Sequence, residues 1–139
     1  MTDAGDLPED VHALLREHIE SYEQLEILLL LRRERYEDWT PQGLTTRLRL
    51  PAELIESALT GLKASGLVEA TGADPTPRFA YRPASSGLDA AVGRLEREYS
   101  ERPISIIKLM SANAIERVRT AALHTFADAF VLKKDKNRG

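Results

Sequence analysis

Two helix-start signals, ten residues apart, most constrain what this chain can fold into. Thr40 is suited to accept backbone N–H groups as an N-cap, and it precedes Pro41, a residue favoured at the first helical position. Pro51 repeats the start signal, so the residues between the two prolines must form one short helix and a tight turn. After Pro51, apolar residues recur at helical spacing and Gly66 follows as a breaker; the apolar residues are Leu54, Ile55, Ala58, Leu59 and Leu62. The sequence therefore predicts two short helices joined by a turn, the second with one buried face.

A β-hairpin is predicted directly after these helices. Residues 67–70 are typical of a strand, and residues 71–77 have the Gly, Pro and Asp content of a turn. Large residues alternate over 78–82, which predicts a second strand that pairs with the first.

This order of elements resembles the winged-helix regulators of bacteria, most closely the MarR-like and ArsR-like groups. In those proteins a stretch of the form L-x-x-L-x-x-x-G-L-V closes the recognition helix, and residues 59–68 have this form here. The resemblance covers about residues 20–84. It implies that the hairpin is a wing, that the second motif helix faces the major groove, and that helices outside the motif form a dimer.

Further helices are predicted before the motif. Pro8 opens one whose apolar stripe runs from Val11 to Ile19, and Ser21 caps a second whose middle, residues 27–31, is apolar all round. This second helix is expected to be the centre of the core. Tyr36 and Trp39 follow it and are expected to pack there.

The chain after the hairpin is also predicted to be helical. Ser85 or Ser86 caps a helix that ends near Arg102, a short helical piece covers 104–110, and Asn113 opens the last helix. The predicted fold class is mainly α: a winged helix-turn-helix with a two-stranded wing and additional N- and C-terminal helices. The expected organisation is a flexible N-terminus (1–7), a winged-helix domain (8–84), a helical extension that dimerises (85–134) and a flexible basic tail (135–139).

Charge is divided unevenly along the chain. Through Ala70 there are seven Lys and Arg against fourteen Asp and Glu, and from Thr71 onward twelve against eight. The acidic half contains the expected DNA-reading helix, although phosphate neutralisation supplies much of the affinity of DNA-binding proteins. Two functions therefore remain open: a DNA-binding transcription regulator, or a winged-helix protein–protein interaction module that does not bind DNA.

Seven residues are candidate DNA contacts. Two arginines flank the motif turn, two lie on the predicted wing, and three residues lie on the expected exposed face of the second motif helix: Arg47, Arg49, Arg78, Arg82, Ser57, Thr60 and Lys63. Ala52, Glu53 and Glu56 share that face, and phosphates repel the two carboxylates. For each arginine the alternative is an ordinary surface ion pair.

The last predicted helix carries apolar residues every three or four positions, namely Ile115, Val118, Ala122, Phe126 and Phe130. This stripe favours the two-fold interface of a homodimer. The alternative is packing within the chain, onto the central helix.

Several function classes are disfavoured by what the sequence lacks. There is no cysteine, which excludes disulfides and thiolate metal sites, and the three histidines have no metal-type spacing. No Gly-rich phosphate loop or nucleophile elbow is present. We therefore expect a non-catalytic protein without metal or cofactor. The start of the chain has no apolar signal region, and residues 27–31 are too few to span a bilayer, so a cytoplasmic location is expected.

Overall fold

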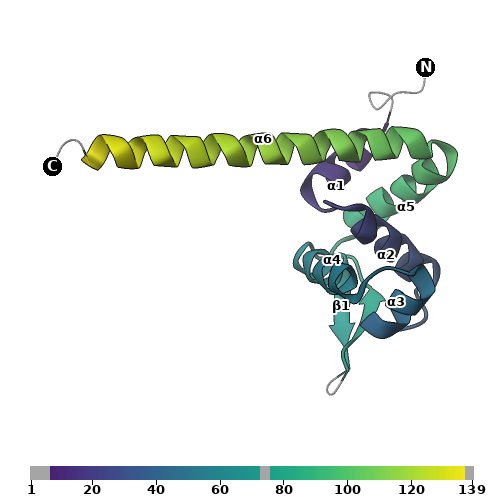
Figure 1. The fold of residues 1–139 in the computed structure, drawn as a ribbon. Coiled ribbons are helices and arrows are strands. Elements are labelled where there is room, and N and C mark those ends of the chain that lie inside the picture. The colour runs from purple at the N-terminus through teal and green to yellow at the C-terminus, as the bar shows by residue number, and fades with distance from the viewer. Residues whose placement is uncertain (1–6, 73–75, 137–139) are drawn as a thin grey trace.

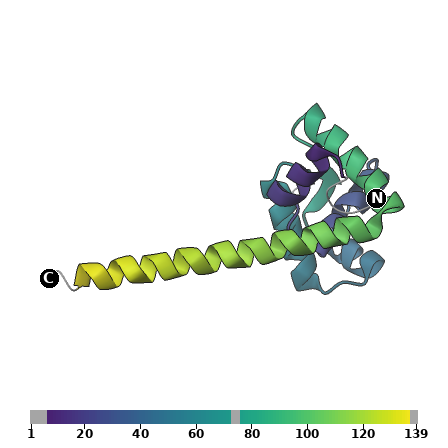
Figure 2. The ribbon, with the colours of Figure 1, turned by 90° about the horizontal axis from the view of Figure 1, so that it is seen from above.

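The computed structural model describes residues 7–72 and 76–136, with side chains described up to residue 129. It contains six helices and one hairpin: α1 (Glu9–Glu17), α2 (Tyr22–Arg33), α3 (Pro41–Leu48), α4 (Ala52–Ala64), β1 (Val68–Thr71), β2 (Arg78–Tyr81), α5 (Ser86–Glu101) and α6 (Pro103–Lys136). Figure 1 shows the first five helices and the hairpin gathered into one body, from which the C-terminal part of α6 extends. The view from above in Figure 2 also shows the C-terminal part of α6 extending away from this body. Residues 1–6 of the expected flexible N-terminus and 137–139 of the expected tail lie outside the described residues, whereas Leu7 is buried.

Three of the predicted helix caps are confirmed. The hydroxyl oxygen of Thr40 accepts the N–H of Gly43 at 3.0 Å, with Pro41 at the first position of α3. Ser21 and Ser85 cap α2 and α5 in the same way. Arg49 ends α3 in the left-handed conformation, with φ of 57°, which turns the chain sharply before Pro51. The helix-turn-helix is therefore built by local signals.

The hairpin is antiparallel, with pairing that runs from Val68 opposite Tyr81 to Thr71 opposite Arg78. Trp39 joins it through two backbone hydrogen bonds with Phe79, of 2.9 and 2.7 Å. The connection between α2 and α3 is thereby tied to the wing. The hydroxyl of Thr71 also donates to a carboxylate oxygen of Asp38 at 2.9 Å.

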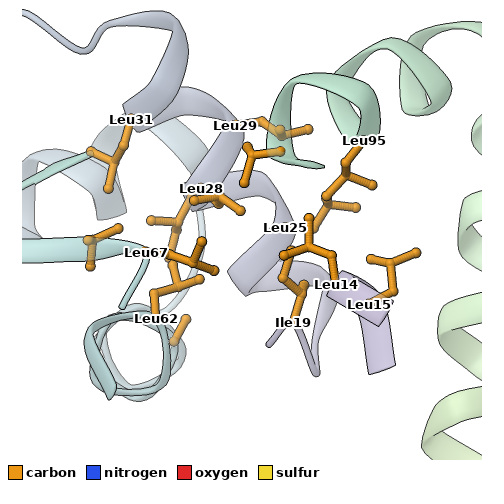
Figure 3. Close-up of a cluster of buried hydrophobic side chains, with 14 of the residues drawn as sticks. Leu14, Leu15, Ile19, Leu25, Leu28, Leu29, Leu31, Leu62, Leu67 and Leu95 are labelled. Atoms are coloured by element: carbon orange, nitrogen blue, oxygen red, sulfur yellow. The ribbon is translucent and has the colours of Figure 1, made fainter. Parts of the chain in front are cut away.

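Helix α2 forms the centre of the hydrophobic core, because most of its side chains are buried. In Figure 3, Leu28 points toward Leu62 of α4 and Leu67 before β1, while Leu25 lies beside Leu14 and Ile19 at the α1 end. One cluster of buried residues therefore includes side chains from the helix-turn-helix and from α1, α5 and the start of α6. The division of the chain at residue 84 stays a prediction.

The prediction of two separate helices after Pro103 is wrong, because α6 is continuous from Pro103 to Lys136. No glycine or proline lies between 104 and 136, so nothing interrupts the helical hydrogen bonds. Asn113 lies inside this helix and is half-buried, and it does not cap a new one.

Two other packing expectations need correction. Tyr36 lies beyond the end of α2 and is 91% exposed, with the Arg35 guanidinium 5.8 Å from its ring centre, so it is not part of the core. Leu54 is 42% exposed, because it lies at the edge of the α4 face whose buried residues include Ile55 and Leu59. Trp39 is partly buried and packs against the core as expected.

The burial of α4 makes a prediction about stability. Leu59→Ala should lower the free energy of unfolding by about 2–5 kcal/mol, because it leaves a cavity at a fully buried site. Leu54→Ala is the matched control and should cost well under half as much, since part of its side chain already meets water. Urea denaturation followed by circular dichroism measures both, and equal losses would contradict the burial assignment.

Candidate nucleic-acid interface

The solvent-facing side of α4 has the composition that the sequence predicts. All six expected residues are exposed: Ala52, Glu53, Glu56, Ser57, Thr60 and Lys63. The Thr60 hydroxyl donates to the carbonyl oxygen of Glu56 at 2.9 Å, which leaves its oxygen lone pairs as acceptors toward solvent. The face therefore offers hydroxyls, two carboxylates near its start and one cation near its end.

An open hollow of about 410 Å³ separates α4 from the wing. Its lining combines polar residues of α4 with apolar residues of α3, α4 and the hairpin: Glu56, Thr60, Lys63, Leu59, Pro41, Pro77 and Phe79. Arg78, which is exposed, lies between Pro77 and Phe79 in the chain. The fold therefore brings Thr60 and Lys63 of α4 close to the wing strand that carries Arg78.

The five predicted cations differ in whether they already have a partner. Within the described ranges, Arg49, Lys63 and Arg78 form no ion pair. Arg82 lies 3.6 Å from a carboxylate oxygen of Glu69, and Arg47 lies 3.5 Å from one of Glu34. The two side chains of the Arg82 pair are mostly exposed, so this pair contributes little to stability.

The two wing arginines are not neighbours. Arg78 is opposite Thr71 at the loop end of the hairpin, whereas Arg82 follows β2 and its N–H bonds the carbonyl of Leu67 at the base. The hydroxyl of Tyr81 next to it donates to Asp89 of α5 at 2.6 Å. Burial and this hydrogen bond raise the pKa of Tyr81 well above its ordinary value. The base of the wing is thus fastened to α5.

The predicted dimer stripe faces away from the rest of the chain. Ile106 and Leu109 of α6 are buried against the body. Ile115 lies nine residues after Ile106, and Val118 lies nine residues after Leu109. At about 100° per residue, nine residues are half a turn of the helix wheel, so the two apolar faces are opposed. Val118 is 70% and Phe126 is 71% exposed. Packing of this stripe onto α2 does not occur in the structure, and the Phe130 side chain lies outside the described residues.

Sequence reasoning missed the residues that surround Arg47. Its guanidinium carbon is 5.8 Å from the centre of the Trp39 ring, and the same side chain meets Glu34. Local sequence patterns carry no signal for this cluster, because it forms only when the α2–α3 connection folds back over α3.

No metal-type grouping of three or more His, Asp or Glu side chains occurs in the part of the chain that the structure describes. His12 and His18 are half-buried on and after α1, and His124 is exposed on α6. None of the described helices is long and apolar enough to cross a lipid bilayer.

No protein-family model and no curated protein sequence matches the chain. Among solved structures, it is similar to the homodimeric winged helix-turn-helix DNA-binding domain of a Mycobacterium bovis protein described as "a possible ArsR-family transcriptional regulator". That match has 19% identity and a TM-score of 0.51, and it covers 67% of this chain and 82% of the other. A MarR family transcription regulator matches with 17% identity and a TM-score of 0.50, over 86% of this chain and 80% of its own. At these identities the likeness concerns the fold, and the chain has the winged helix-turn-helix fold that both of these regulators share.

Proposed function

We propose that this protein is a DNA-binding transcription regulator that acts without catalysis and as a homodimer. The observation that carries the proposal is the exposed face of α4 beside a wing, with Arg49, Lys63 and Arg78 free of ion pairs within the described residues. The structural neighbour from Mycobacterium bovis is itself a homodimeric DNA-binding domain, which supports the same general kind of function.

In this proposal α4 enters the major groove and the wing approaches the sugar–phosphate backbone. Lys63 and the two unpaired arginines contact phosphates, and Ser57 and Thr60 reach base edges. Glu53 and Glu56 lie on the same face, where their charge repels phosphates and lowers the affinity for arbitrary DNA.

The salt dependence of DNA binding tests the phosphate contacts. Replacing Lys63 and Arg78 together with glutamine should weaken binding to many duplex sequences and reduce the logarithmic salt slope by up to about two units. Arg97→Gln is a single-charge control, because Arg97 is exposed on α5, outside the helix-turn-helix and the wing. Fluorescence anisotropy of a labelled duplex at several salt concentrations measures the slope. An unchanged slope removes the two residues from the site, and absence of binding by the wild type at low salt refutes the proposed function.

The homodimer rests on the distal part of α6. This helix has 34 residues, which corresponds to about 50 Å, and side chains 118–129 are all exposed. A helix without tertiary contacts is marginally stable in water, so a cover for its apolar stripe stabilises it. A second copy presents the same stripe, and a two-fold axis places the two stripes face to face. Ala122, between Val118 and Phe126, leaves room for close approach of the partner helix.

Charge placed on this stripe should separate the two copies. Val118→Glu with Phe126→Glu buries four carboxylates in the proposed dimer, so we expect a monomer with a folded winged helix and reduced helicity in α6. Thr120→Glu with His124→Glu puts equal charge on the opposite side of the same helix and should leave the dimer intact. Multi-angle light scattering at micromolar concentration gives the mass. A monomeric wild type would contradict the interface.

A second candidate function is a winged-helix module that binds another protein and not DNA. The presence of Glu53 and Glu56 on the exposed face of α4 favours it, as does the pairing of Arg47 and Arg82 with carboxylates. The salt titration of the wild type separates the two functions, because a protein-binding module would not retain a labelled duplex even at low salt.

A further inference from the structure

Arg47 differs from the other cations of the motif because two residues hold it. Its Nη2 atom donates to Oε1 of Glu34 at 3.5 Å, and its guanidinium lies over the ring of Trp39 at 5.8 Å. Glu34 directly follows α2 and Trp39 precedes the N-cap of α3. The holding residues thus come from the α2–α3 connection, and Arg47 comes from the last turn of α3.

This contact directs Arg47 away from the motif turn. Side chains of a helix lean toward its N-terminus, and Trp39 lies eight residues, about two turns, before Arg47. The guanidinium is therefore drawn back along α3, while Arg49 remains at the turn without an ion pair within the described residues. In this arrangement Arg47 and Arg49 do not contact one phosphate together.

The hold on Arg47 is weak enough to be exchanged. The Arg47 and Glu34 side chains are 52% and 32% exposed, and ion pairs of this kind contribute little because water and salt screen them. A DNA phosphate offers shorter, charge-assisted and bidentate hydrogen bonds to the same guanidinium.

We propose that Glu34 and Trp39 hold the Arg47 guanidinium in a docked position when the protein is free of DNA. On DNA binding, a phosphate replaces these two residues as the partner of Arg47. This inference rests on the proposed function. Glu34 is then a positioning residue that acts through Arg47: it competes with phosphate and lowers the affinity for DNA. The Trp39 backbone is bonded to Phe79 of the wing, so its main chain stays tied to the wing when Arg47 leaves. The stacking contact is lost on DNA binding and restored on release.

The chain contains one tryptophan, so intrinsic fluorescence reports the docked state directly. Titration of the full-length protein with duplex DNA should change the Trp39 emission in step with binding, which is measured separately by anisotropy of a labelled duplex. Arg47→Gln should still bind DNA, through Lys63 and Arg78, but with little emission change. Inorganic phosphate at the same phosphate concentration should produce no change, because it lacks the other contacts that bring the backbone to Arg47.

A double-mutant cycle tests the role of Glu34. Glu34→Gln should raise the affinity for duplex DNA several-fold and steepen the logarithmic salt slope toward one further unit, since Arg47 becomes free to neutralise a phosphate. In the Arg47→Gln background the same substitution should have much less effect. Glu37→Gln is the matched control: it removes an equal charge from an exposed position in the same connection, so its effect should be the same in both backgrounds.

Three results would overturn the inference while the proposed function stands. They are DNA binding by the wild type without an emission change, an emission change that persists in Arg47→Gln, and a Glu34→Gln effect that is equal in both backgrounds. By contrast, absence of duplex binding by the wild type at low salt would overturn the proposed function and this inference together. Far-ultraviolet circular dichroism of each variant verifies that it is folded.

Discussion

The burial of α2 is the constraint on which the rest of the structure depends. Leu28 and Leu31 lie toward the helix-turn-helix and hairpin, and Leu25 lies toward α1 and α5, so one helix supplies core to both ends of the body. Gly61 lets α4 approach α2 closely, because a Cβ atom there would lie 2.2 Å from Nε2 of Gln24 and that side chain would have to shift. Since packed interiors resist deformation, the exposed face of α4 is held at a set distance from α6.

The residues through Ala70 carry an excess of acidic side chains, and the positions of these carboxylates decide what the excess does. Glu34 and Glu69 pair with Arg47 and Arg82, whereas Glu53 and Glu56 are exposed on α4. In the proposed function, the electrostatic attraction available for DNA is therefore smaller than a count of arginines indicates, because two of these arginines already have carboxylate partners. For the proposed DNA-binding function, this distribution of charge favours selective contacts over strong general attraction to phosphate.

Helix α6 combines two apolar faces that point in opposite directions. Ile106 and Leu109 complete the core of the chain, and half a turn around the helix Ile115 and Val118 are exposed. Asn113, Arg117 and His124 of α6 line a hollow beside Arg16 of α1. This change of apolar face along one uninterrupted helix is the pattern that the proposed homodimer needs, because one face packs on the chain itself and the other is left for a second copy.

Most elements and the fold class follow from sequence patterns alone, because caps, prolines and apolar periodicity act over a few residues. Thr40, Ser21 and Ser85 start helices where predicted, and the alternating residues after 78 form a strand. The same local patterns misplaced Tyr36 and divided α6 at Asn113, since neither exposure nor helix continuity depends on one residue's preference. Three features emerge from the folded arrangement of the elements: which cations remain unpaired, the contact of Arg47 with Glu34 and Trp39, and the outward direction of the stripe that begins at Ile115. Each of these depends on how separate elements pack against one another, which local propensity does not specify.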